Sequence, residues 1–226
     1  MLGTIAIIPS APVLVPALVG AAAVELTELR DAVLTAAAAL PPRWVALGAG
    51  RTDAVIGPEA VGTLAGFGAD VRVRLSPQAG GDPVAVPLCA LIAGWVRGQT
   101  HPDAAVQVRI YGDDVAAARR HGRRLRAELD DAADPIGVLV LADGATTLTA
   151  AAPGGYHPGD GELQRRLDDA LGRGDTAALT DLPAQVAGRV GYAALAGLAE
   201  PGPRSAKELY CGAPYGVGYF AGVWQP

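Results

Sequence analysis

Short apolar runs alternate along this chain with longer segments whose apolar residues recur at helical spacing. The apolar runs over 2–8, 44–47 and 136–142 and the alternating segments over 71–75 and 106–111 are typical of strands. Helical spacing predicts helices over 18–40, 86–96 and 113–131, and two or three more over 162–198. The aromatic tail, 209–224, is expected to add two short strands. This order of elements indicates an α/β fold, and no linker divides residues 1–226 into separate domains.

The composition is sufficient for the hydrophobic core that an α/β fold needs. Half of the 226 residues are hydrophobic and 18% are charged. The net charge of −5 argues against general affinity for nucleic acid or for an anionic membrane. Prolines interrupt the apolar N-terminus, and no later stretch reaches the roughly 18 apolar residues of a membrane span. We therefore expect a cytoplasmic protein with no nucleic-acid or membrane partner, and two cysteines, Cys89 and Cys211, that are reduced and buried.

Chemistry in α/β sheets usually sits on loops beyond the carboxyl ends of strands. Four such places carry polar residues, namely Ser10, Arg51, Asp143 and the approach to Glu208. Asp143, directly after the cleanest strand, is either a functional carboxylate or a cap for local N–H groups. His157 lies in a Gly/Pro-rich loop that either covers a cleft or has no further role.

The other two histidines have plainer interpretations. His101 falls in a short loop, and His121 lies within an arginine-rich run that indicates the solvated face of a helix. No two histidines are placed to hold iron together with a carboxylate. The chain also has no P-loop, no dinucleotide fingerprint and no G-x-S-x-G turn.

Four segments, in this order, resemble class III extradiol ring-cleavage dioxygenases of the LigB-like superfamily. They are Ile7–Pro16, Val86–Leu88, Val138–Gly144 and Ala213–Tyr219, which resemble the opening turn, an internal helix start, a strand leading to an Asp turn, and a closing strand. The resemblance implies a three-layer LigB-like α/β domain with a mixed central sheet flanked by helices. It also implies an Fe(II) centre in the active members.

The chain departs from that family at the iron ligands. Ser10 stands where the first histidine ligand is expected, and the loop ending at Arg51 replaces the second. Residues 145–147 lack the histidine expected to act on substrate and oxygen. Glu208 is the only plausible counterpart of a ligand. A serine hydroxyl and a guanidinium cannot replace two neutral imidazoles, so the leading prediction is a fold without the iron site and without a cofactor.

Three functional hypotheses follow. The first is an iron-free relative whose cleft, formed by Ser10, Arg51, Asp143, His157 and Glu208, binds a small ligand or a protein partner. Arg51 would favour an anionic ligand. The second is an active Fe(II) extradiol dioxygenase that acts on a catechol-type substrate and holds its metal with His157, Asp143 and Glu208. The third is a metal-free hydrolase or transferase with Asp143 as the general base.

The tail from Tyr210 to Trp224 is either part of the core or a dimer interface, because tyrosine and tryptophan are enriched in both. Since LigB-like proteins often associate, the expectation is a homodimer.

Overall fold

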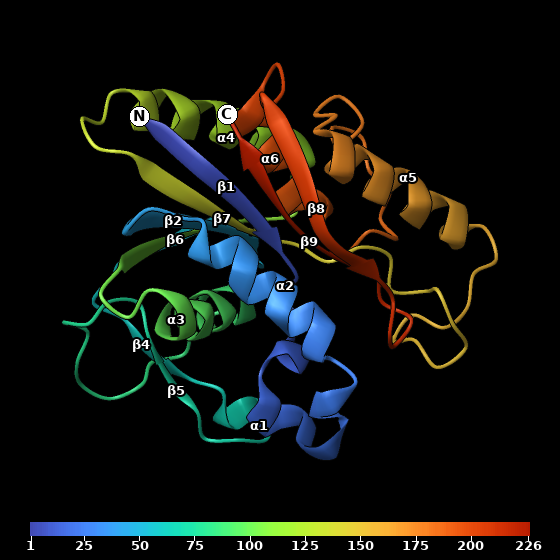
Figure 1. The fold of residues 1–226 in the computed structure, drawn as a ribbon, viewed down its shortest axis with the longest axis horizontal. Helices are drawn as coiled ribbons and strands as arrows, with labels where there is room; N and C mark the ends of the chain where they lie inside the picture. Colours follow the sequence, from blue (N-terminus) through green and yellow to red (C-terminus); the bar gives the residue numbers. More distant parts are fainter.

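A seven-stranded sheet organises the computed structural model, which describes all residues, 1–226 (Figure 1). The strand order is β3-β6-β2-β7-β1-β9-β8. The strands are β1 (Leu2–Ile8), β2 (Arg43–Ala49), β3 (Ala54–Ile56), β6 (Ala105–Tyr111), β7 (Ile136–Leu141), β8 (Ser205–Gly212) and β9 (Tyr219–Gln225). The four central strands β6, β2, β7 and β1 are parallel, and the outer strands β3, β9 and β8 pair antiparallel. The predicted mixed central sheet is therefore confirmed.

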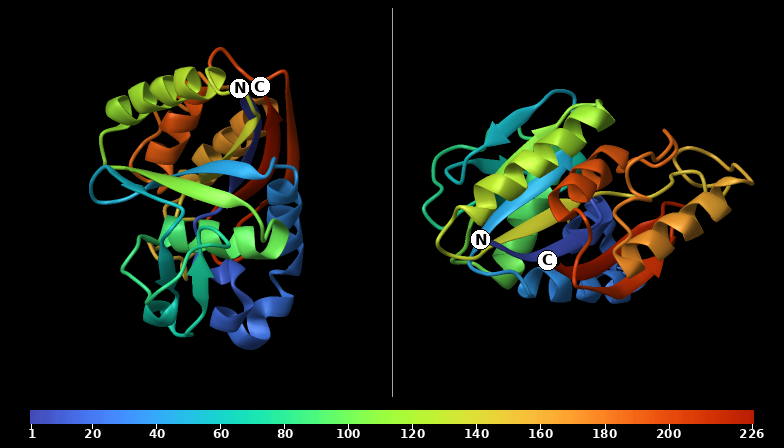
Figure 2. Two further views of the ribbon diagram at one scale, coloured as in Figure 1. Left: turned by 90° about the vertical axis from the view of Figure 1, so that its left-hand side faces the viewer. Right: turned by 90° about the horizontal axis from the view of Figure 1, so that it is seen from above.

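Helices cover both faces of this sheet (Figure 2). Helices α2 (Thr27–Ala38) and α3 (Leu88–Thr100) pack on one face, and α4 (Val115–Asp130), α5 (Asp160–Arg173) and α6 (Arg189–Ala199) pack on the other. Successive strand residues point to opposite faces, so Ile8 of β1 joins the first core and Ile7 joins the second. The long apolar runs of β1 and β7 follow from burial on both faces.

Smaller elements complete the α2/α3 side. They are α1 (Pro16–Val19), the short 3₁₀ helices η1 (Pro12–Leu14), η2 (Gly20–Val24) and η3 (Ala65–Phe67), and a two-stranded sheet of β4 (Val61–Thr63) and β5 (Arg72–Arg74). The single helix expected over 18–40 is wrong in its first half. Gly20 adopts a positive φ of 54°, which ends α1, and the regular helix starts only at Thr27.

Other element boundaries shift by a few residues. The helix cap expected at Asp113 is one residue further on, where the Asp114 carboxylate accepts the Ala117 N–H at 2.8 Å. Strand β3 was not expected from the sequence. It is three residues long and lies at the sheet edge with Val55 exposed, so it lacks the apolar run of a buried strand.

The aromatic tail belongs to the chain's own core. Tyr219, Phe220 and Trp224 are buried, and the Trp224 indole N–H donates to the Leu171 carbonyl at 2.8 Å. These rings therefore no longer argue for a homodimer, which stays a prediction. Cys89 is buried as expected, but Cys211 is exposed because it lies on the edge strand β8. No helix has both the length and the apolar character needed to cross a membrane.

Candidate functional site

The loops singled out in the sequence follow the carboxyl ends of the parallel strands. Register pairs Ile8 of β1 with Leu141 of β7, and Ala49 of β2 with Tyr111 of β6. Because these strands are parallel, the loops after β1, β2, β6 and β7 all leave from the same end of the sheet, the end where these strands finish.

Asp143 and Ser10 meet directly at this end of the sheet. The Ser10 backbone N–H donates to Asp143 Oδ1 at 3.0 Å. The carboxylate thus ties its own turn to the loop after β1 instead of capping N–H groups within the turn. Its second oxygen, Oδ2, takes part in no hydrogen bond with the protein. Burial raises the pKa of Asp143 to about 6, and the bond from Ser10 offsets only part of that rise.

Two tyrosines that sequence reasoning missed lie beside Asp143. The Tyr192 hydroxyl donates to the Ala142 carbonyl at 3.0 Å, one residue before the carboxylate. Tyr219 is also buried, and its pKa is raised first by burial and then by the negative charge of Asp143. Two tyrosine rings therefore border Asp143, and reduced contact with water keeps a carboxyl group protonated up to a higher pH.

Arg51 and His157 lie on loops at the same end of the sheet but do not contact Asp143. Arg51 follows β2, the strand next to β7, and its exposed side chain makes no ion pair or hydrogen bond. The His157 side chain is 60% exposed, and its Nδ1 lies 3.7 Å from Asp160 Oδ2. Asp160 in turn accepts a hydrogen bond from the buried Thr147 hydroxyl. His157 is thus held at the surface of the loop that follows Asp143.

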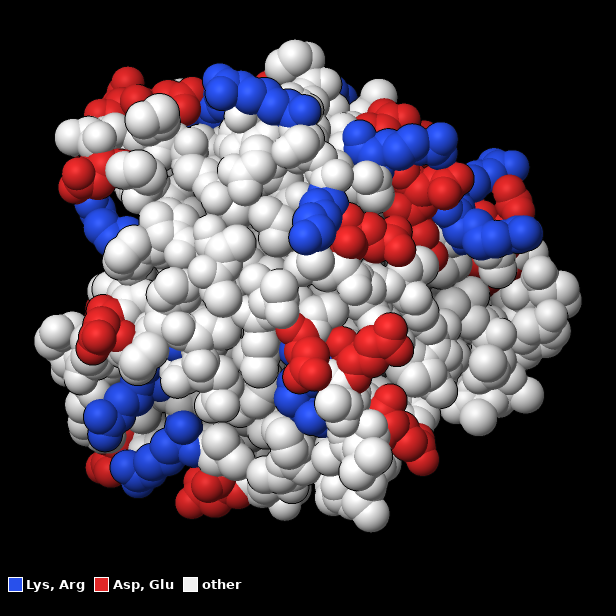
Figure 3. All heavy atoms as spheres, viewed as in Figure 1, with Lys and Arg blue, Asp and Glu red and all other residues white.

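Glu208 lies apart from this group, and its place in the expected five-residue cleft stays a prediction. Glu208 pairs with Gly222 of β9, Gly222 with Ile7 of β1, and Ile7 with Val140 of β7. Three strand spacings therefore separate it from β7, roughly 14 Å. Glu208 lies beside α5, where its charge contributes to the raised pKa of Asp168. Figure 3 shows acidic and basic side chains gathered over α5 and β8.

The donor set does not fit the Fe(II) that the family resemblance implies. Ser10 and Arg51 stand where the resemblance leads us to expect two imidazoles, and Glu208 lies about three strand spacings from β7. The alternative ligand set of His157, Asp143 and Glu208 is not assembled either. Nowhere in the chain do three His, Cys, Asp or Glu side chains gather closely enough to hold a metal ion.

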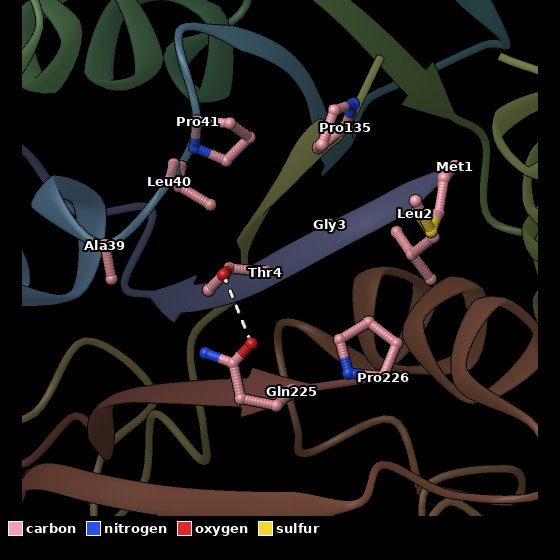
Figure 4. Close-up of a pocket in the computed structure, with 10 residues that line it drawn as sticks. All are labelled: Met1, Leu2, Gly3, Thr4, Ala39, Leu40, Pro41, Pro135, Gln225 and Pro226. Carbon is pink, nitrogen blue, oxygen red and sulfur yellow. Dashed lines mark hydrogen bonds between the residues drawn. The ribbon is translucent and has the colours of Figure 1, made fainter. Parts of the chain in front are cut away.

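A cavity of about 420 Å³ lies at the opposite end of the sheet, where β1 and β7 begin, beside the N-terminus and the C-terminus (Figure 4). Its lining includes no titratable side chain, and its polar side chains, Thr4 and Gln225, are hydrogen-bonded to each other at 3.3 Å. The close-up shows these two facing each other between the ends of β1 and β9, with prolines and aliphatic residues around them. This cavity offers no reactive group.

Comparison with known proteins supports the overall fold but assigns the chain to no family. No protein-family model matches the chain, and no curated protein sequence matches it. Solved structures do match it, among them the crystal structure of the uncharacterized protein JW3007 from Escherichia coli K12. That match has a TM-score of 0.59 at 11% sequence identity and covers 98% of this chain and 99% of the other. The chain thus has the overall fold of this bacterial protein from end to end.

Proposed function

We propose that this protein is a divergent, iron-free relative of the class III extradiol dioxygenases that binds a small anionic ligand at Asp143. The observation that carries the proposal is the half-buried Asp143 carboxyl group, whose Oδ1 is bound by Ser10 and whose Oδ2 makes no hydrogen bond with the protein. A group of this kind lowers the stability of the fold, and perturbed carboxyl groups concentrate at functional sites.

The placement of the four family-like segments supports the relationship. Residues 9–12 form the turn after β1, α3 begins at Leu88 with Pro87 as its N-cap, and β7 leads directly into the Asp143 turn. The fourth segment leads into β9. Three segments thus lie where the resemblance expects them, whereas residues 213–218, expected to form a closing strand, form the turn before β9.

The side chains of Asp143 and Arg51 favour a ligand that carries both a hydroxyl group and a negative charge. Above its pKa, the free oxygen of Asp143 accepts a hydrogen bond from a ligand hydroxyl. The unpaired Arg51 guanidinium, on the loop after the neighbouring strand β2, would bind a carboxylate. His157 lies on the loop that borders the same end of the sheet and would contact the ligand only from outside.

The test combines metal analysis with binding of 3,4-dihydroxybenzoate as the probe. Protein prepared without oxygen and incubated with Fe(II) should retain no stoichiometric iron, and it should consume no oxygen with the probe. The probe should nevertheless bind, with an affinity that rises as the pH increases through about 6, where Asp143 ionises. Asp143→Asn should abolish that pH step, whereas Asp82→Asn, in an exposed loop, should preserve it.

Two outcomes would contradict the proposal. Stoichiometric iron together with oxygen consumption would instead establish an active extradiol dioxygenase with ligands other than those considered above. Binding without any pH step near 6, or an unchanged step in Asp143→Asn, would show that the ligand does not contact Asp143.

A further inference from the structure

A second cavity, of about 330 Å³, lies between α4 and two strands, the edge strand β3 and its neighbour β6. Figure 2 shows α4 lying along this face of the sheet. Asp53 and Tyr111 are at strand ends, and His121, Arg124 and Glu128 recur at i, i+3 and i+7 on one side of α4. The lining is Asp53, Ala54, Val55, Arg109, Ile110, Tyr111, His121, Arg124 and Glu128.

Tyr111 contributes a polar atom that lacks a partner. The residue is 5% exposed, and its hydroxyl is the only fully buried side-chain polar atom in the chain without a hydrogen bond. Buried tyrosine hydroxyls almost always have a partner, because the lost hydrogen bond to water is otherwise not replaced. The orphan hydroxyl therefore marks a place where a hydrogen-bonding group is missing.

The neighbouring histidine is fixed in position. The His121 ring stacks on Tyr111 with centroids 5.1 Å apart and planes 9° from parallel. Its Nε2 lies 3.1 Å from Asp53 Oδ2, and Asp53 Oδ1 accepts the Gly112 N–H at 2.7 Å. The stack and the carboxylate together hold the aromatic wall of the cavity rigid.

The acceptors of the lining are already engaged, whereas donors remain free. Asp53 is bound by Gly112 and His121, and Glu128 is paired with Arg109 at 2.5 Å. Arg124 is exposed and makes no ion pair or hydrogen bond. The groups left over are thus a guanidinium and a phenolic hydroxyl, and their complement is an acceptor with a negative charge.

We propose that this cavity binds a small organic monocarboxylate. The carboxylate pairs with Arg124 and accepts a hydrogen bond from the Tyr111 hydroxyl, and a flat apolar body lies against Ala54 and Val55. A phosphate dianion is less suitable, because Asp53 and Glu128 place two negative charges in the walls. The volume is near the lower limit for small-molecule sites, which restricts the ligand to about the size of a single substituted ring.

The test measures binding of benzoate to the full chain by isothermal titration calorimetry at pH 7, with neutral benzamide and inorganic phosphate as comparison probes. Benzoate should bind, and the other two should bind at least about tenfold more weakly, because a charge-assisted hydrogen bond is lost or a repulsion is added. Arg124→Gln should weaken benzoate binding by about tenfold or more.

Two further variants separate binding from folding. Tyr111→Phe keeps the stacked ring and removes only the unpartnered hydroxyl, so it should weaken benzoate binding several-fold without lowering the unfolding temperature. Arg120→Gln removes another exposed, unpaired arginine of α4 that does not line the cavity, and it should bind benzoate as the unmodified chain does.

The inference is overturned if benzoate does not bind, if it binds equally well to Arg124→Gln, or if phosphate binds more tightly. Loss of benzoate binding in Asp143→Asn but not in Arg124→Gln would place the anion at the carboxyl end of β7 and would likewise overturn it. Since the two proposed sites use different residues, either proposal can fail without the other.

Discussion

Replacement of Asp143 by asparagine should stabilise the protein at neutral pH. The substitution keeps an oxygen that accepts the Ser10 N–H and removes the charge that burial disfavours. The pKa of Asp143 is raised from 3.8 to about 6 in the folded chain. That difference of about two pH units corresponds to a cost of roughly 3 kcal/mol for the ionised side chain at pH 7.

The pH dependence gives the sharper test. The folded state holds the Asp143 proton more tightly than the unfolded state does, so the carboxyl group costs little stability below pH 3.8. The cost grows as the pH rises from 3.8 to about 6 and is constant above that. The stability of Asp143→Asn relative to the unmodified chain should therefore increase by about 2–3 kcal/mol between pH 4 and pH 8.

Urea denaturation at several pH values, followed by circular dichroism, measures this difference. Taking the difference between two proteins cancels the titration of every other group, and Asp82→Asn serves as the control with a flat profile. A relative stability of Asp143→Asn that does not change between pH 4 and pH 8 would refute the reasoning. It would mean that water or a flexible turn solvates the carboxylate in the folded chain.

Two other predictions concern how the helices are joined. Glu200, whose pKa is lowered to about 2 by two arginines of α4, should contribute about 1 kcal/mol after allowance for its partial exposure. Glu200→Gln should lose that stability at pH 6, and the difference should vanish as the pH falls from 4.5 toward 2. Glu162→Gln, on an exposed helix face, should change little. Gly122→Ala should cost at least about 2 kcal/mol in thermal unfolding, since its Cβ would lie 2.1 Å from the Ala194 carbonyl of α6. Gly98→Ala has open space around it and should gain up to about 1 kcal/mol, so equal effects of the two would contradict the α4–α6 contact.

The parts of the fold that the sequence predicts are those where burial alone decides the pattern. The strand over 136–142 is a continuous apolar run because β7 is covered on both faces, and Asp143 ends it. Strand β3 escapes prediction because an exposed edge strand needs no apolar run. The prediction of one helix over 18–40 is wrong in its first half, because alanine and leucine also occur in the short helical segments that meet at Gly20.

The candidate sites are less predictable because they depend on strand order. Sequence spacing indicates that Asp143 and Glu208 both belong to strand regions, but it does not say that β1 and β9 lie between β7 and β8. Likewise, the arginines around His121 suggest a solvated helix face. Only the pairing of β3 with β6 brings Asp53 to that face of α4 and turns His121 into part of a cavity wall.

The two proposed sites share a physical feature that the rest of the chain lacks. Asp143 at the end of β7 is a half-buried carboxyl group with one hydrogen bond, and Tyr111 at the end of β6 carries a buried hydroxyl with none. In both places a polar group is removed from water without a full set of hydrogen bonds, which costs free energy. Both groups stand where parallel strands end, which is where α/β folds bind ligands. We therefore interpret these incompletely bonded groups as the two places where the protein is built to meet another molecule.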